Sequence, residues 1–184
     1  MSDVNLRFLA SSMPDYAKDI KLNLTSIENI TSLTPQQLWG TALASAIASR
    51  NELVLAAMDA EAKAKLSPEA MKAAKGAAAL MAMNNVYYRF THLVDDDNFA
   101  TMRANLRMNF MRGHGVETAD FELWSLAVSA VNGCGQCMSS HVGSVLKEGL
   151  TREAIHDAVR VASIVHAAAV TLEGEEHFLA AEHA

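Results

Sequence analysis

Three segments of the chain carry the same signal for the start of a helix: Leu33-Thr34-Pro35, Leu66-Ser67-Pro68 and Leu150-Thr151-Arg152. A hydroxyl at the N-cap accepts a hydrogen bond from an unpaired backbone N–H, and the leucine before it pairs with an apolar residue at the fourth helical position. In the first segment, Gln37 completes a capping box. These signals fix three helix starts, so the chain is expected to fold from helices.

The residues between these starts support the same fold class. Alanine is abundant, β-branched runs are scarce, and no stretch alternates as a strand does. Residues 1 to about 12 are expected to form a fraying lead-in, with Leu6, Phe8 and Leu9 able to dock on a core. We predict an all-α protein with one domain over residues 1–184. The expected helices span 14–30, 35–62 with a break near Arg50, 68–91, 97–110, 119–132, 134–148 and 152–182.

An internal repeat is a second prediction about the fold. The segment Leu38–Ile47 resembles Leu123–Val131 once one residue is skipped, and both lie in apolar helices that lead to a break. Two similar halves, 14–95 and 96–184, would explain this. Only the second half would then carry a C-x-x-C unit, at the start of a helix. Chance similarity between alanine-rich helices is the alternative.

Composition excludes some classes of function. The net charge of −6 argues against a general nucleic-acid binder, which needs clustered Lys and Arg. The first residues lack a signal peptide, and no apolar run is expected to reach the length of about 18 residues that a membrane span needs. We therefore expect a soluble cytoplasmic protein. In that reducing compartment a C-x-x-C pair is more often catalytic or metal-binding than a structural disulfide.

The only two cysteines stand in one short stretch. Cys134 and Cys137 form the C-x-x-C unit, and His141 follows the second cysteine by four residues. In a helix these three residues fall at i, i+3 and i+7, along one face. Two thiols one turn apart can close a disulfide, and a base one turn further can accept a thiol proton. The spacing favours dithiol redox chemistry.

Two effects compete to activate different thiols. A free cysteine has a pKa of about 8.5, so its thiol is mostly protonated at neutral pH. A helix N-terminus at Cys134 would favour the thiolate there, whereas His141 is only one turn from Cys137. We favour Cys137 as the base-assisted thiol and Cys134 as its partner.

Glu122 precedes the first cysteine by twelve residues, on the preceding helix. If the chain folds back at Asn132-Gly133, this carboxylate would lie beside His141 and orient its ring. The alternative is a solvated residue that favours its own helix dipole. The apolar residues expected to keep the site dry are Leu123, Trp124, Leu126, Ala127 and Val131.

Two other interpretations of the cysteines stay open. Cys134, Cys137 and His141 could be three zinc ligands, although no second C-x-x-C or H-x-x-x-H unit supplies a fourth. The thiols could also be ordinary buried side chains. The ten methionines are interpreted as core residues.

The run A-V-N-G-C-G-Q-C-M-S-S-H, with its upstream glutamate, closely resembles the alkyl hydroperoxidase D (AhpD) branch of the carboxymuconolactone-decarboxylase-like superfamily. The similarity extends to residues 77–90, 106–109, 120–130 and 150–155. The resemblance implies an all-helical fold assembled as a homotrimer, with no bound cofactor. It also implies a thiol peroxidase that reduces alkyl hydroperoxides.

In that family scheme, Cys137 would attack the hydroperoxide and become a sulfenic acid, and Cys134 would resolve it to a Cys134–Cys137 disulfide. His141 and Glu122 would relay protons. The electron donor would be a dihydrolipoyl group on a dihydrolipoamide acyltransferase, and the partner peroxiredoxin would be alkyl hydroperoxide reductase C. These steps are thiol–disulfide exchanges.

One residue departs from part of the family. Some members carry a histidine at the position of Gln136, and an amide cannot take a proton near neutral pH. A dithiol relay without its own peroxidase activity is therefore an alternative. A decarboxylase-like superfamily member and a non-catalytic, zinc-stabilised helical scaffold are the others.

Overall fold

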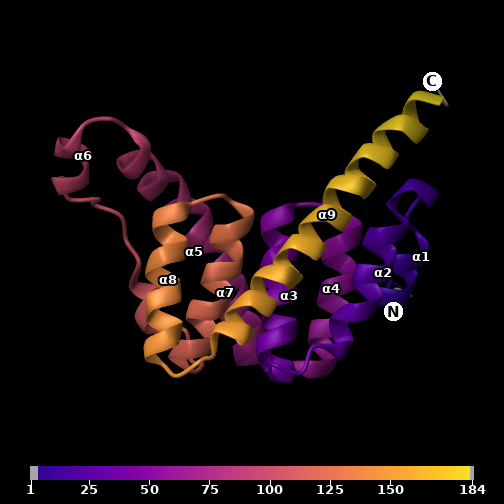
Figure 1. Ribbon diagram of the computed structural model, residues 1–184, viewed down its shortest axis with the longest axis horizontal. Coiled ribbons are helices and arrows are strands. Elements are labelled where there is room, and N and C mark those ends of the chain that lie inside the picture. The colour runs from indigo at the N-terminus through magenta and orange to yellow at the C-terminus, as the bar shows by residue number, and fades with distance from the viewer. Residues whose placement is uncertain (1–3, 183–184) are drawn as a thin grey trace.

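The computed structural model describes residues 4–182, and within that range the regular structure is helical, without strands (Figure 1). The α-helices are α1 (Leu6–Ser11), α2 (Lys18–Ser26), α3 (Pro35–Ser49), α4 (Glu52–Lys65), α5 (Pro68–Leu93), α6 (Asp97–Thr101), α7 (Thr118–Val131), α8 (Gly135–Lys147) and α9 (Arg152–Glu182). Three short 3-10 turns lie at Asp15–Ala17, Ile27–Asn29 and Asn109–Arg112. The all-α prediction is confirmed.

The three capped helix starts are present as the sequence predicted. Thr34 Oγ1 accepts from the backbone N of Gln37, whose side chain accepts in turn from Thr34 N, so the capping box is complete. Ser67 and Thr151 accept at 3.1 Å from the backbone N–H three residues later. The expected break near Arg50 is also present, because Arg50 ends α3 in a left-handed conformation with φ 65°.

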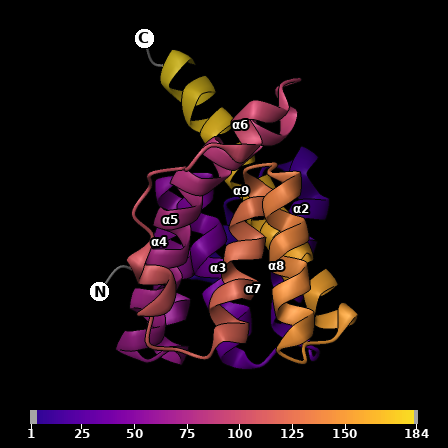
Figure 2. The ribbon, with the colours of Figure 1, turned by 90° about the vertical axis from the view of Figure 1, so that its left-hand side faces the viewer.

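Helices α3 and α7 lie side by side in the middle of the fold, and α9 packs across both (Figures 1 and 2). Helix α5 packs on α3 and α7 from another side, and α8 packs on α7 and α5. Gly40 permits the close approach of α3 to α7, since a Cβ at this position would stand 2.2 Å from the ring of the fully buried Trp124. This packing fixes α7 and α8 relative to α5.

Helix α9 has no uncharged run longer than residues 161–172, but it is apolar on average. Its stretch Arg152–Phe178 is long and apolar enough to cross a membrane by length and composition. However, 56% of its most apolar window is buried inside the protein, in the larger hydrophobic cluster with residues of α1–α4 and α7. Such burial is typical of the core helix of a soluble protein.

The N-terminal region differs from the prediction. Residues 14–30 form α2 between two 3-10 turns instead of one helix. The Thr25 and Ser26 hydroxyls donate to carbonyls three residues back, which is the local competition that weakens helices in such polar segments. Within the expected lead-in, the described residues from Leu6 form α1, capped by the Asn5 side chain. Its Leu6 and Leu9 are buried, whereas Phe8 is exposed.

The predicted helix over 97–110 is wrong. The helix α6 ends at Thr101, and the following residues run without regular structure to the turn at Asn109–Arg112. Asn105 has a positive φ of 52°, which a continuous helix does not allow. Phe110 packs against Gly76 of α5, where an added Cβ would lie 1.9 Å from its ring. This tertiary contact overrides helix propensity and docks the segment 102–112, the lid segment, on α5.

Candidate active site

The two cysteines lie where α7 turns back into α8. Gly133 has φ 69°, a conformation that suits glycine, and it turns the chain between the two helices. Cys134 is the N-cap of α8, and Cys137 lies in its first turn. They form a disulfide with Cα atoms 5.3 Å apart, and the backbone N of Cys137 donates to Cys134 Sγ at 3.3 Å.

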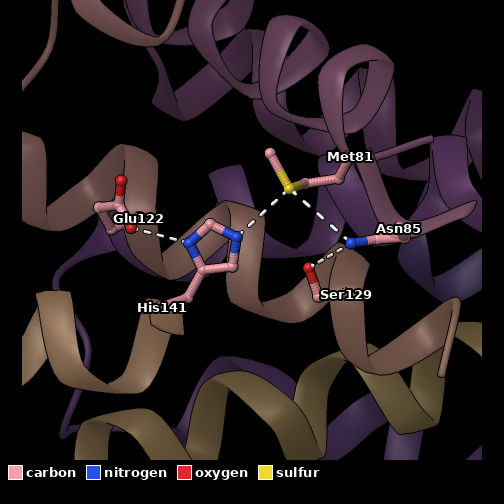
Figure 3. A network of polar contacts seen from close by, with 5 residues as sticks. All are labelled: Met81, Asn85, Glu122, Ser129 and His141. Carbon is pink, nitrogen blue, oxygen red and sulfur yellow. Dashed lines mark hydrogen bonds and ion pairs between the residues drawn. The ribbon is translucent and has the colours of Figure 1, made fainter. Parts of the chain in front are cut away.

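A buried polar network holds this turn against α5. Asn85 donates to Ser129 Oγ at 2.9 Å (Figure 3). It also accepts from Asn132 Nδ2 at 3.0 Å. Arg89 donates to the backbone carbonyl of Asn132. Since Asn132 stands two residues before Cys134, these bonds fix the position of the disulfide relative to α5.

Glu122 and His141 meet across the helix pair, as the fold-back at Asn132-Gly133 predicted. Glu122 Oε2 lies 2.7 Å from His141 Nδ1, and their side chains are only 15% and 8% exposed (Figure 3). The other ring nitrogen, Nε2, lies 3.3 Å from the Met81 sulfur. Which ring nitrogen donates and which accepts depends on the tautomer, and the Glu122 carboxylate can accept from Nδ1–H.

A cavity of about 300 Å³ lies between α5, α8 and the lid segment. This size is at the lower end of ligand pockets and suits one small organic molecule. The α8 side contributes polar and sulfur groups, and the other walls are mainly apolar. The lining residues are Met81, Asn84, Tyr88, Met108, Met111, Gln136, Cys137, Ser140 and His141.

The cavity distinguishes the two cysteines. Cys137 lines it and is 7% exposed, whereas Cys134 is fully buried and does not line it. Both effects named from the sequence are present: the helix N-terminus acts on Cys134 through the Cys137 N–H, and His141 follows Cys137 by one turn. A molecule in the cavity therefore reaches the sulfur of Cys137 first.

The four predicted site residues lie on the α7–α8 pair: Cys134 and Cys137 form the disulfide at the turn, and His141, further along α8, contacts Glu122 of α7 and lines the same cavity as Cys137. None of the five residues of the predicted apolar wall lines the cavity, and Leu123, Trp124 and Leu126 pack into the core instead. The apolar wall comes instead from α5 and the lid segment. Met81 is buried, as expected of the methionines, and it also contacts His141, a contact across helices that spacing within α5 does not indicate.

The zinc interpretation finds no geometric support in the described residues. Among the described side chains of residues 4–178, no three of His, Cys, Asp or Glu are arranged to hold a metal ion. His141 presents one nitrogen to Glu122 and the other to Met81, and the two sulfurs are bonded to each other.

Comparison with known proteins agrees with this arrangement. The family model described as the carboxymuconolactone decarboxylase family matches residues 97–174. The chain is 55% identical to the alkyl hydroperoxide reductase AhpD of Streptomyces coelicolor over 179 residues, covering 97% of this chain and 100% of that protein. It is 58% identical to the AhpD of Streptomyces griseus over 167 residues (91% and 94%). It is 56% identical to the AhpD of Gluconacetobacter diazotrophicus over 171 residues (93% and 94%). Because these matches cover 91–97% of this chain, the chain belongs to the AhpD family of alkyl hydroperoxide reductases.

Proposed function

We propose that this protein is a thiol peroxidase that reduces alkyl hydroperoxides through a Cys134/Cys137 dithiol–disulfide cycle. The observation that carries the proposal is the cavity, which exposes Cys137 and His141 to a small molecule while Cys134 stays behind them. Its methionine-rich walls favour a hydroperoxide with a hydrocarbon group. The AhpD relatives are named as alkyl hydroperoxide reductases, which supports the same chemistry.

In the peroxide step, the Cys137 thiolate attacks the distal oxygen of the hydroperoxide. The O–O bond breaks, the alkoxide leaves with a proton as an alcohol, and Cys137 becomes a sulfenic acid. Cys134 then attacks this sulfur, water leaves, and the Cys134–Cys137 disulfide forms. Their Cα separation of 5.3 Å lies within the range that a disulfide requires, so no backbone rearrangement is needed.

The Glu122–His141 pair is the proton relay in this scheme. It lies one helical turn from Cys137, is largely shielded from solvent, and joins Nδ1 to Oε2 across 2.7 Å. With Nδ1–H donating to Glu122, the neutral ring takes the thiol proton of Cys137 on Nε2 and returns it to the leaving alkoxide. The contact with Glu122 holds the ring in this orientation.

The electron donor in this proposal is a dihydrolipoyl group, a dithiol on a flexible arm. One of its thiolates attacks Cys137 Sγ, the more accessible sulfur, and Cys134 leaves as a thiolate that accepts from the Cys137 N–H. The second lipoyl thiol then attacks the mixed disulfide, which releases Cys137 and closes the lipoyl ring. A dihydrolipoamide acyltransferase would carry this group.

The proposed protein partners are a peroxiredoxin of the alkyl hydroperoxide reductase C type and further copies of this chain in a homotrimer. Exposed apolar side chains support self-association. Val86, Phe90 and Leu93 share one face of α5 near its exposed end, and they are 62%, 48% and 71% exposed. We also place the protein in the cytoplasm. Sedimentation of the purified protein tests the assembly, and a monomer would contradict it.

The proposal is tested by consumption of cumene hydroperoxide with dihydrolipoamide as the donor. We expect turnover by the wild type and its loss in both Cys134→Ser and Cys137→Ser. Unchanged turnover in Cys137→Ser would refute the peroxidase. A wild type that cycles between dithiol and disulfide without consuming peroxide would instead support a relay, which Gln136 between the cysteines favours because its amide cannot carry a proton.

The decarboxylase alternative rests on the description of the family model that matches residues 97–174. Decarboxylation of a carboxymuconolactone does not need a dithiol. Activity on that substrate that survives replacement of both cysteines would favour this alternative over the peroxidase.

A further inference from the structure

Asn84 is a buried polar side chain without a partner in the active-site cavity. It is 4% exposed, and its Oδ1 accepts no hydrogen bond from the described residues 4–178. A buried carbonyl oxygen left unpaired destabilises a protein, so native structures rarely keep one unless something else binds it. Three buried hydroxyls also lack a hydrogen-bond partner among the described residues, those of Thr41, Ser45 and Ser125, but none of these residues lines the cavity.

The neighbouring residue, Asn85, has a structural role. Asn85 is 1% exposed, and both ends of its amide are bonded, to Ser129 and to Asn132. Asn84 points from the same helix to the cavity and makes no such bond. Two adjacent residues of one type therefore differ in what they contact: one holds the cysteine turn, and the other faces the space in front of Cys137.

Asn84 lies on the wall of the cavity opposite Cys137 and His141. Met81, Asn84 and Tyr88 line the cavity from one face of α5, at i, i+3 and i+7. Asn84 lies about one helical turn after Met81, whose sulfur contacts His141 Nε2. On the opposite wall, α8 presents Cys137 and His141. An acceptor thus stands across the cavity from the thiol, in a wall otherwise formed by Met81 and Tyr88.

We propose that Asn84 is a substrate-positioning residue whose Oδ1 accepts a hydrogen bond from the O–H of the hydroperoxide. This inference rests on the proposed peroxidase function. The hydrogen of an alkyl hydroperoxide is carried by its distal oxygen, the atom that the thiolate attacks. A bond from this O–H to Asn84 would hold the distal oxygen in the cavity that Cys137 lines, with the hydrocarbon group against the apolar walls.

The experiment compares two oxidants on the pre-reduced protein in single turnover. Cumene hydroperoxide presents an O–H group, whereas diamide converts dithiols to disulfides without one. The variants are Asn84→Leu, which keeps the shape of the side chain and removes its polar atoms, and Asn85→Leu as the matched structural variant. Disulfide formation is followed by alkylation of the remaining thiols and mass spectrometry, and thermal unfolding is measured in parallel.

We expect Asn84→Leu to react about tenfold more slowly with cumene hydroperoxide, the loss that one hydrogen bond represents, and to react with diamide at the wild-type rate. Its unfolding temperature should equal or exceed that of the wild type, because a buried unpaired oxygen is removed. Asn85→Leu should unfold at a lower temperature, because Ser129 and Asn132 lose their partner.

Several outcomes would overturn the inference. Equal losses with both oxidants, or a fall in unfolding temperature as large as in Asn85→Leu, would make Asn84 a structural residue. If the wild type and Asn84→Leu react equally fast with cumene hydroperoxide, only the role of Asn84 fails. If the wild type reacts with diamide but not with the hydroperoxide, the peroxidase function fails, and the role of Asn84 fails with it.

Discussion

Replacement of Glu122 by glutamine tests the proton relay with the smallest change in shape. The carboxylate oxygen lies 2.7 Å from His141 Nδ1 in a largely buried pair. A hydrogen bond to a charged group contributes about 1.5–3 kcal/mol, and a neutral one about 0.5–1.5 kcal/mol. Glutamine can keep the neutral bond, so the variant should lose about 1–2 kcal/mol of support for the cationic ring, which corresponds to a roughly 5- to 30-fold slower reaction.

The assay is the single-turnover rate of disulfide formation after cumene hydroperoxide is mixed with the reduced protein. Glu148→Gln, which changes an exposed carboxylate at the end of α8, is the matched control and should react as the wild type does. Thermal unfolding of both variants establishes that the fold is retained. If folded Glu122→Gln forms the disulfide at the wild-type rate, Glu122 takes no part in the relay.

Four further substitutions test the packing of the helices and of the site. Gly40→Ala should destabilise the protein by about 1–3 kcal/mol, because its Cβ meets the Trp124 ring at 2.2 Å, whereas Gly174→Ala, with nothing within 4 Å, should stabilise it by about 0.5–1 kcal/mol. Urea unfolding of both measures these changes, and shifts of the same sign would contradict the packing. Phe110→Ala should release the lid segment and speed alkylation of reduced Cys137 by iodoacetamide; an unchanged rate would mean that this segment does not restrict access. Met81→Leu conserves side-chain volume, so it should lower the free energy of unfolding in urea by less than about 1.5 kcal/mol. It should also slow the hydroperoxide reaction less than Glu122→Gln does. A larger loss of rate would mean that the contact of the Met81 sulfur with His141 contributes to the reaction.

Local signals were enough to predict much of the fold. Thr34, Ser67 and Thr151 each act within four residues of their own position, so the sequence alone places the starts of α3, α5 and α9. The break at Arg50 and the turn at Gly133 are likewise local. The division into two similar halves at 95/96 depends on a weak sequence similarity and stays a prediction.

The errors arose where distant residues decide the conformation. The segment after Thr101 has helix-forming residues, yet the contact of Phe110 with Gly76, 34 positions earlier, keeps it extended over the cavity. The contact of Met81 with His141 could not be predicted for the same reason, because it forms only when α5 lies against α8. Spacing within one helix brought Cys134, Cys137 and His141 together, and the fold-back at Gly133 added Glu122.

The most direct test of the proposed chemistry asks which sulfur reacts with the peroxide. Reduced Cys134→Ser and Cys137→Ser are each mixed with one equivalent of cumene hydroperoxide in the presence of dimedone, and the adduct is located by mass spectrometry. Because Cys137 alone of the two lines the cavity, we expect a dimedone adduct on Cys137 in Cys134→Ser and no adduct in Cys137→Ser. An adduct on Cys134, with none on Cys137, would reverse the assignment of the two thiols and contradict the proposed mechanism.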